Sequence, residues 1–574
     1  MCLQSVMFKL LTSIEDQLRS IHEADSDVTE QEKTGWNETT VVVLSGITKL
    51  LADYLDVLCD HHTFKASWKS LLNHFISLLG FEVMEINTAV FKALRQLLSR
   101  GNQKNGKTNF DRDSLDLAWG LWAQSLPKVK KSKTEISSKN FSNQDYFLAN
   151  VSTLQEGYRL IESELEVGRV KTMLRLMRDA IQQANAANYS ADVEYLTPLQ
   201  TQVLELLKMI RTDIDGVPAA LISQVAEFVA LAFKPKPSQE GKQSPTYIAL
   251  SKASMTLSET LVLAHSADKH IYISGAVLSS LEALAQPIVL KYSFPITTKS
   301  ISPWQQATTS SLVILRAILP TITSADVNED ITRSIWASVV TIANGITSAD
   351  CDELPETVNI KSDEDFDIAS FLTMRELITP ALGSHIIFDK ARRAYTESLF
   401  HMSLIHTPQP HEMPQVNQEL LAVLALPRQG FTSDSPPSVR SRMSYVCIDE
   451  LLSLVAVHDS TLPRVKLAQA AAPFLILRAG LTIRAYIADQ PLRGHMPQPL
   501  SQRKELLYIL KALVKLRCEP SGIPDMPAVE SEGKKHLLRL YPLLSKAIRA
   551  ASRDQEVLDW IGKALDEVGL EFAV

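Results

Sequence analysis

The chain has 574 residues, of which 45% are apolar and 21% are charged, and its formal net charge is −7. This composition is that of an ordinary globular protein, and the length allows two to four conventional domains or one continuous helical solenoid. The negative net charge argues against nucleic-acid binding. Apolar residues recur at intervals of three and four instead of alternating, so we expect helices throughout.

The five cysteines are scattered and form no CxxC pair: Cys2, Cys59, Cys351, Cys447 and Cys518. An odd number at such spacing indicates neither a disulfide framework nor a zinc site, and a reducing cytosolic compartment fits best. No uninterrupted apolar run reaches the roughly 18 to 20 residues that span a bilayer. The longest candidate, Ala470 to Ile487, contains a proline, a glycine and two arginines. We therefore expect any membrane contact to be peripheral.

The first strong helical pattern runs from Trp68 to Leu79, with Gly80 at the position of a C-terminal cap. Its apolar residues form one stripe: Trp68, Leu71, Leu72, Phe75, Ile76 and Leu79. Asn87 is expected to cap a second helix that ends near Gly101. A helix near Val41 to Leu58 would pack beside this pair, because one helical hairpin cannot bury both of its apolar faces alone.

The next sharp start is Ser302-Pro303-Trp304-Gln305, a capping-box pattern with proline at the first helical position. We expect this helix to continue to Leu319 and to end before Pro320. Further helical patterns follow at Trp336 to Ile342, Phe371 to Leu382 and Glu505 to Arg517. No constant repeat period is visible, so the predicted fold is an all-α solenoid of irregular HEAT- or armadillo-like helical hairpins.

Polar and proline-rich stretches divide the chain. We predict five regions: N-terminal HEAT-like hairpins (1–126), a basic polar linker (127–145), middle helical repeats (146–426), a Pro/Ser-rich loop (427–440) and a C-terminal basic helical region (441–574). Two loops are expected within the middle repeats, at 234–245 and 350–367. The second of these holds eight acidic residues against one lysine, Lys361.

Catalytic motifs are absent from the sequence. There is no phosphate loop, dinucleotide fingerprint, nucleophile elbow, HExxH or kinase signature. His61 and His62 would point about 100° apart on a helix. The five-residue spacing of His401, His406 and His411 does not align them on a helix either. We therefore assign no catalytic, cofactor-binding or metal-ligating residue, and we predict a protein that is not an enzyme and needs no cofactor.

Cations gather in the C-terminal region. Thr461 to Arg517 carries ten Lys or Arg residues against two acids, and Gly533 to Arg553 adds six without any acid. Steps of four, three and four residues place one set on a single helical face: Lys504, Tyr508, Lys511 and Lys515. Basic faces attract acidic partners or anionic lipid headgroups, although a solvated helix exterior has the same pattern. The residues predicted to bind a partner or a membrane are Arg484, Arg493, Lys504, Tyr508, Lys511, Lys515, Lys534 and Lys535.

One motif in this region is specific. It reads L-R-G-x-x-P-x-P, formed by Leu492, Arg493, Gly494, Pro497 and Pro499, and the helix E-L-L-Y-I-L-x-A-L follows at Glu505 to Leu513. This run resembles the C-terminal region of the Mon-two (monensin-sensitivity protein two) family. The helical patterns at Trp68 and Glu85 are similar to repeats of the large Sec7-type Arf exchange factors, to which that family is related.

The resemblance implies a scaffold in endosome-to-Golgi and Golgi vesicle-mediated protein transport that lacks the Sec7 domain. The partners it implies are a Dopey-family protein, a P4-type phospholipid flippase and an Arf-like GTPase. The implied location is cytoplasmic, at the periphery of trans-Golgi network and endosome membranes. Complete members of the family are far longer than this chain, which would then correspond to a C-terminal portion.

Two other interpretations remain open from the residues alone. A different α-solenoid, such as a nuclear transport receptor or an assembly chaperone, would hold a cargo peptide in pockets between paired helices. A helical enzyme of unrecognised type would carry a bound cofactor or metal.

Overall fold

The computed structural model describes residues 2–23, 29–101, 110–123, 142–185, 192–234, 245–295, 297, 299–324, 328–351, 354, 358–384, 386–408, 413–414, 420–425, 436–458, 464–523 and 533–572. Among them every regular element is a helix, and one isolated antiparallel bridge joins Ala456 to Cys518. The all-α prediction is therefore confirmed. The chain divides into two compact units, described separately below: unit 1 is Met1–His265 with Thr297–Ser300, and unit 2 is Ser266–Ile296 with Ile301–Val574.

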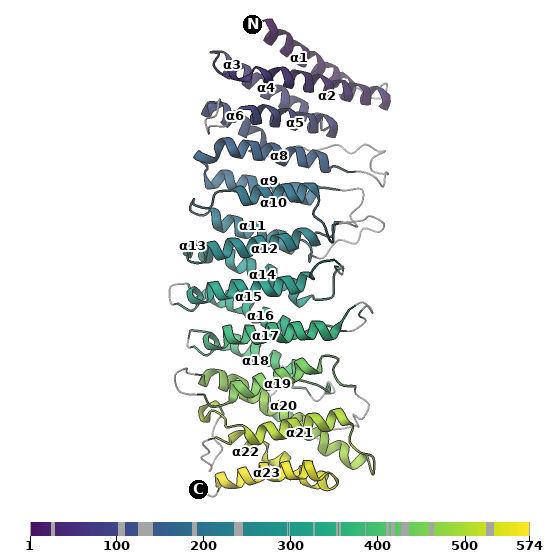
Figure 1. The fold of residues 1–574 in the computed structure, drawn as a ribbon, viewed down its shortest axis with the longest axis vertical. Coiled ribbons are helices and arrows are strands. Elements are labelled where there is room, and N and C mark those ends of the chain that lie inside the picture. The colour runs from purple at the N-terminus through teal and green to yellow at the C-terminus, as the bar shows by residue number, and fades with distance from the viewer. Residues whose placement is uncertain are drawn as a thin grey trace. The chain divides into compact units, whose positions relative to one another are not determined.

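Unit 1 holds the purple to teal helices of Figure 1. They are α1 (Cys2–Glu23), α2 (Glu30–Asp53), α3 (Leu55–Cys59), α4 (Phe64–Leu79), α5 (Met84–Gly101), α6 (Arg112–Ala123), α8 (Gln144–Ile161), α9 (Val167–Gln183), α10 (Pro198–Met209), α11 (Val217–Ala230) and α12 (Ile248–His265). α5 packs between α2 and α8, and α11 packs along α12.

Local sequence explains where several unit 1 helices begin. The Thr29 side chain accepts from the Glu32 backbone N–H while Glu32 reaches back to Thr29, and Thr197 and Gln200 repeat this capping box at α10. Between helices, the Trp68 indole donates to the Ser114 carbonyl over 2.9 Å, and the Thr153 hydroxyl donates to the Phe91 carbonyl over 2.8 Å. These bonds satisfy polar groups that would otherwise be buried without partners.

Unit 2 holds the teal to yellow helices. They are α13 (Lys269–Ile273), α14 (Ala276–Val289), α15 (Pro303–Ile322), α16 (Glu329–Thr347), α17 (Ile360–Leu382), α18 (Asp389–Met402), α19 (Ser441–Val455), α20 (Val465–Leu492), α21 (Leu500–Lys515), α22 (Lys535–Ala550) and α23 (Gln555–Phe572). Short 3₁₀ turns lie at Ala422–Ala425, Pro520–Gly522 and Ala551–Arg553.

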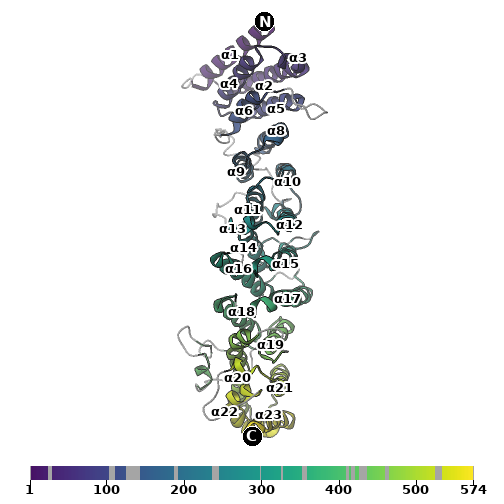
Figure 2. The same ribbon diagram turned by 90° about the vertical axis from the view of Figure 1, so that its left-hand side faces the viewer.

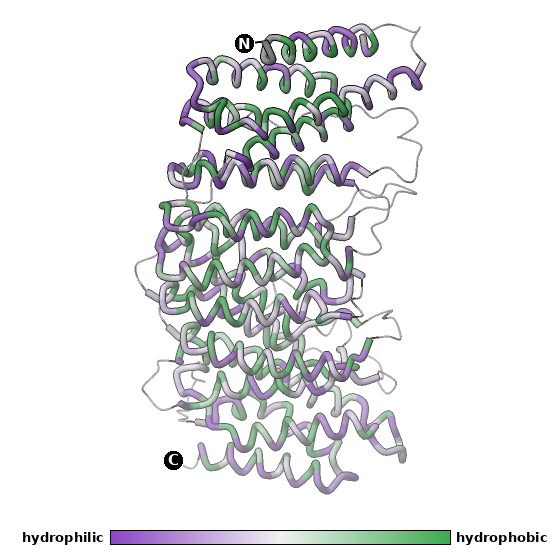
Figure 3. Tube along the Cα trace, turned by 45° about the horizontal axis from the view of Figure 1, so that its top comes forward, coloured by the Kyte–Doolittle hydropathy of each residue, from purple (hydrophilic) through white to green (hydrophobic). Residues whose placement is uncertain are grey.

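The later helices of unit 2 form two layers. α16, α18, α20 and α22 pack one on the next, while α15, α17 and α19 form the second layer together with α21 and α23, as Figure 2 shows from the side. Within single helices, hydrophobic and hydrophilic residues alternate around the axis (Figure 3). Many of the helices therefore bury one stripe against their neighbours, which is the packing of a helical solenoid of hairpins.

The predicted helix at Trp68 to Leu79 is confirmed as α4, with Gly80 at its C-cap. Ile76 departs from the predicted stripe and is exposed. The helix expected near residues 41–58 begins earlier, at Glu30, because the Thr29 capping box starts it there. Asn87 is not a cap, since α5 begins at Met84 and Asn87 is buried inside it.

Two further corrections concern α15 and α17. Ser302 stands at the N-cap of α15, but its side chain makes no capping hydrogen bond. This helix runs through Pro320 to Ile322, because a proline in the last turn removes only one backbone hydrogen bond. The predicted loop at 350–367 is helical from Ile360 onward, where Asn359 caps the Ser362 backbone N–H. Acidic side chains are stabilised near a helix N-terminus, which explains why an acid-rich stretch folds this way.

Several predicted loops fall outside the described residues: 127–141 of the basic linker, 235–244 and 427–435. The position of His411 lies outside them as well.

Among the described helices, α20 alone has the length and composition to cross a membrane, despite the proline, glycine and arginines between Ala470 and Ile487. In that apolar window 72% of the residues are buried, against α18, α19 and α22. The core helix of a folded unit has this packing.

Candidate interaction surface

The four residues predicted to share a basic face do lie along α21. Lys504 and Lys515 are exposed, whereas Tyr508 and Lys511 are half-buried. The Lys511 ammonium lies 2.9 Å from Glu556 of α23, and the Tyr508 hydroxyl donates to Asp449 of α19. Neighbouring helices thus neutralise the middle of this face and leave the positive charge at its two ends.

The other four predicted residues make contacts inside unit 2. Arg484, Arg493 and Lys535 are buried, so their charged groups are not part of the exposed surface. Lys535 donates to the Pro520 carbonyl over 2.7 Å. Lys534 is mostly buried, pairs with Glu567 at 3.1 Å and donates to the Val514 carbonyl. Buried cations require such partners, since an unpaired charge in a low-dielectric interior is costly.

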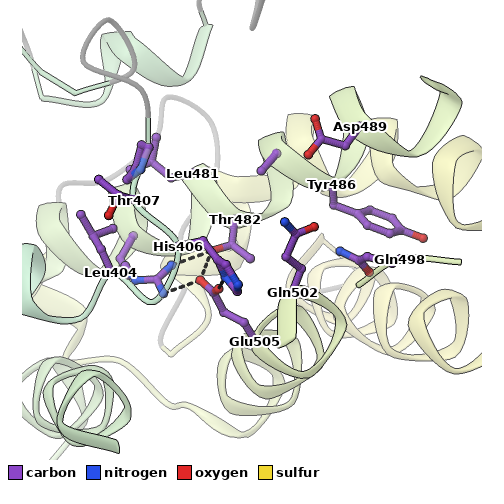
Figure 4. A pocket seen from close by; sticks show the side chains of 13 residues that line it. Leu404, His406, Thr407, Leu481, Thr482, Tyr486, Asp489, Gln498, Gln502 and Glu505 are labelled. Carbon is purple, nitrogen blue, oxygen red and sulfur yellow. Dashed lines mark hydrogen bonds and ion pairs between the residues drawn. The ribbon is translucent and has the colours of Figure 1, made fainter. Parts of the chain in front are cut away.

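A charged network joins α20, α21 and the segment after α18 (Figure 4). The Arg478 guanidinium lies 2.5 Å from Glu505 Oε1 and donates through Nε and Nη2 to the Ser403 carbonyl, at 3.1 and 3.0 Å. Figure 4 shows His406 and Thr482 directed at the Glu505 carboxylate. His406 Nδ1 lies 2.6 Å from the second carboxylate oxygen, Oε2. The Thr482 hydroxyl donates to Glu505 Oε1 over 3.1 Å. The buried carboxylate of α21 therefore binds two other segments, α20 and the segment after α18.

The electrostatics of Glu505 follow from these partners. Burial alone would raise the pKa of Glu505, but the Arg478 charge and the hydrogen bond from His406 together lower it. Beside the network lies a cavity of about 60 Å³, lined among others by Leu404, Tyr486 and Gln502. This volume holds a few water molecules, whereas small-molecule sites measure about 300–1,000 Å³. The network is thus a structural clamp with no room for a substrate.

A second buried cluster of charges forms around one acid of α17, Asp367. Asp367 lies 2.5 Å from both the Lys291 ammonium and the Arg440 guanidinium. Lys291 also donates to the Ile346 carbonyl over 2.9 Å, and Arg440 donates to the Thr347 carbonyl over 3.1 Å. Burial lowers the pKa of Lys291 to about 8, even though Asp367 favours its charged form. Asp367 therefore stabilises unit 2 from within, as the buried counter-charge of two cations.

Unit 1 contains an open groove that the sequence did not indicate. Its volume is about 690 Å³, its floor is α5, and α2 and α8 form its walls. Three carboxylates line it, from Glu38, Glu85 and Asp145, against one lysine, Lys92. Apolar wall residues include Val42, which is largely exposed. No group of three His, Cys, Asp or Glu side chains positioned for a metal ion occurs in the described part of the chain.

The sequence was compared with protein families, curated proteins and solved structures. No family model matches the chain. It is similar to Protein MON2 homolog of Schizosaccharomyces pombe, with 21% identity over 525 residues, or 89% of this chain. The chain is a distant homologue of part of the MON2 proteins. Monensin-resistant homolog 2 of Caenorhabditis elegans is 18% identical over 96% of the chain, and Protein MON2 homolog of Xenopus laevis is 19% identical over 90%.

The chain spans about one third of the length of the curated MON2 relatives it matches, with 31% to 37% of each covered. The resemblance proposed from the L-R-G-x-x-P-x-P run is confirmed, and it extends over most of the chain. A solved circular tandem repeat protein aligns with 99% of this chain and 96% of its own, at 10% identity and a TM-score of 0.26. That score is too low to bear on the fold.

Sequence reasoning missed both buried networks and the groove. One signal was available for the clamp: Arg478 is a single charge within the apolar run FLILRAGL, and Glu505 is the one acid of a neighbouring helical pattern whose other charges are all positive. A lone charge in an apolar run is a candidate for a buried pair with an opposite charge on a neighbouring helix. The groove left no such signal, because it depends on how α2, α5 and α8 are spaced.

Proposed function

We propose that this chain is part of a non-enzymatic helical scaffold in endosome-to-Golgi and Golgi vesicle-mediated protein transport. The observation that carries the proposal is the homology with MON2 proteins across about nine tenths of the chain. The proposed location is cytoplasmic, peripheral to trans-Golgi network and endosome membranes. The proposed partners are a Dopey-family protein, a P4-type phospholipid flippase and an Arf-like GTPase.

The architecture is compatible with a scaffold. Layers of stacked helices bury a continuous core and leave long helical faces for partners, as in other solenoid proteins. The buried carboxylates Glu505 and Asp367 of unit 2 are each paired with a cation from another segment. The clamp cavity beside Glu505 is too small for a substrate.

For partner docking we propose the two ends of the α21 face. Lys504 and Lys515 are exposed there. The Lys504 ammonium lies 5.8 Å from the centre of the Tyr445 ring, which holds an aromatic surface next to the charge. An acidic segment of a protein partner would complement this face.

The test is a direct binding measurement between the purified chain and a Dopey-family protein of the same organism. We expect the double substitution K504E/K515E to weaken binding about tenfold or more, because it reverses both exposed charges of the face. The matched control is K390E/R393E, which reverses two exposed cations on α18. Equal binding by K504E/K515E and K390E/R393E would remove α21 from the proposal.

The same binding measurement can test the acidic groove of unit 1. The double substitution E85K/D145K reverses two of its carboxylates. Loss of binding in this variant alone would place the partner on unit 1. Absence of binding by the unmodified chain to each of the three proposed partners would contradict the proposed function itself.

A further inference from the structure

The turn between α20 and α21 exposes three large apolar side chains. Leu492 is 64% exposed, Met496 is 64% exposed and Leu500 is 80% exposed. They fall within nine residues, in the stretch LRGHMPQPL that joins the two helices at one edge of unit 2 (Figure 1). Single exposed apolar residues are ordinary, but a group of three on one short turn is typical of an interaction site.

This turn has a defined backbone held by buried groups. The buried Arg493 donates to Gln502 Oε1 over 3.1 Å, and the Met496 backbone N–H donates to the Arg493 carbonyl over 3.1 Å. Gly494 has a φ of +59°, a left-handed conformation that favours glycine. The Arg493 side chain is buried, whereas Leu492 and Met496 on either side of Arg493 and Gly494 are exposed. The exposed apolar side chains therefore stand on a turn whose backbone is fixed by hydrogen bonds.

Exposed cations lie next to the turn. Arg553, at the end of the 3₁₀ turn after α22, donates to the Gly494 carbonyl and so joins the α20–α21 turn to this end of α22. Lys546 and Arg549 lie on the last two turns of α22 and are exposed. Neither has an acidic partner among the residues that the structure describes. Gly533 to Arg553 contains no acidic residue at all.

α22 also exposes apolar surface. Ile548 in its last turn is 40% exposed, and Tyr541, two turns earlier on the same side of the helix, is 46% exposed. The nearest acids downstream, Asp554 and Glu556, are occupied by Arg503, at 2.7 and 2.9 Å. The surface formed by the α20–α21 turn and the outward side of α22 is therefore apolar and cationic, with its neighbouring carboxylates already paired.

We propose that this surface binds an anionic lipid bilayer directly. Leu492, Met496 and Leu500 would enter the headgroup–acyl boundary, and the exposed cations of α22 would contact the lipid phosphates and carboxylates. A bilayer accepts side chains that protrude from a turn, whereas a protein partner would need a matching concave surface. Lys546, Arg549 and Arg553 supply the charge complementarity that selects an anionic membrane. This deepens the proposed function, since a scaffold at a membrane surface is its setting.

The test is co-sedimentation of the full chain with phosphatidylcholine vesicles, with and without phosphatidylserine. We expect binding to the mixed vesicles, weakened by salt. The triple substitution L492S/M496S/L500S should reduce it by tenfold or more, since about 0.8 kcal/mol is lost for each buried CH₂ removed from lipid. K546Q/R549Q should reduce binding to the mixed vesicles by about fivefold for each charge.

The matched control is Leu570→Ser, which removes an equally exposed leucine on α23, away from the turn. It should leave vesicle binding unchanged. Because every substituted residue is exposed, we expect all variants to keep the thermal unfolding midpoint of the parent chain. That measurement separates loss of lipid binding from loss of fold.

The proposal is overturned if the parent chain does not bind the mixed vesicles, or if L492S/M496S/L500S binds them as the control does. It is also overturned if that triple variant keeps vesicle binding and loses a protein partner, because the turn would then be a protein interface. Loss of vesicle binding with protein-partner binding intact supports the lipid proposal. Failure of the lipid test leaves the protein-partner test of the proposed function unaffected.

Discussion

The Arg478 guanidinium and the Glu505 carboxylate meet 2.5 Å apart in the interior of unit 2 and couple α20 to α21. Both side chains are almost fully buried. Because Arg478 also binds the Ser403 carbonyl, and Glu505 also binds His406, the pair determines where the segment after α18 lies. This contact is therefore one of those that hold the region with the exposed turn and the basic face.

Removing one partner of this pair should be costly. We expect Arg478→Met to lower the free energy of unfolding by about 3–5 kcal/mol, because it leaves the Glu505 carboxylate buried without its cation. Adding Glu505→Gln should recover part of the loss. Chemical denaturation measures both. Arg333→Met, at an exposed pair with Glu329 and Asp330, is the control and should cost about 1 kcal/mol or less. Equal effects of Arg333→Met and Arg478→Met would contradict the account.

The α17 cluster gives a second stability prediction. We expect Asp367→Asn to cost about 3–5 kcal/mol, since Lys291 and Arg440 would remain buried without a counter-charge. The control is Asp365→Asn on the same helix, whose partner Arg442 is exposed, as Asp365 itself is. Its effect on the unfolding midpoint should be small. If Asp367→Asn and Asp365→Asn both have the unfolding midpoint of the parent chain, Asp367 has no stabilising role.

Acid sensitivity should arise from His536. Burial lowers the pKa of His536 to about 4, while its ring Nε2 lies 2.8 Å from the Leu513 carbonyl and donates to it. The unfolded chain binds a proton at this histidine from pH 6.5 downward and the folded chain does not. Stability therefore falls as the pH drops from 6.5 to 4, by on the order of 3 kcal/mol.

The variant His536→Gln should show a shallower fall of stability over this pH range, measured by thermal unfolding at several pH values. His495→Gln, at an exposed histidine of the α20–α21 turn, is the control. An unchanged pH dependence in His536→Gln would show that other groups cause the acid sensitivity.

Glu450 should act in the opposite direction. Burial raises the pKa of Glu450 to about 7, against the attraction of Arg375. The folded chain therefore keeps a proton that the unfolded chain loses above pH 4.5, so stability falls as the pH rises from about 4.5 to about 7 and is level above that. We expect Glu450→Gln to raise the free energy of unfolding by about 3 kcal/mol at pH 8 and by about 1 kcal/mol or less at pH 5. A loss of stability at pH 8 would contradict this assignment.

The sequence predicted the helices well and the roles of charges poorly. The stripe through Trp68, Phe75 and Leu79 was predictable because helical periodicity depends only on neighbours within the same segment. Lys511 was predicted to bind a partner or a membrane, yet Glu556 of a different helix pairs with it at 2.9 Å. Whether a charge is free depends on contacts between distant segments, and periodicity contains no information about those contacts.

The motif at Leu492 to Pro499 illustrates the same limit. Arg493 was chosen as a binding residue for its charge, but the turn directs it inward and exposes its apolar neighbours Leu492 and Met496 instead. Gly494, directly after Arg493, has the positive φ of this turn. The family resemblance of the run was correctly identified from the same residues, because it rests on residue identity and not on side-chain orientation.

The central claim is that this chain works as a scaffold in Golgi and endosomal transport. The most direct test is affinity purification of the chain from the cytosol of its own organism, with mass spectrometry of the bound proteins. The account predicts that a Dopey-family protein or a P4-type flippase is recovered, and that K504E/K515E reduces its recovery relative to K390E/R393E. Recovery of nuclear pore components or of chaperone clients in their place would contradict the claim and favour a different α-solenoid.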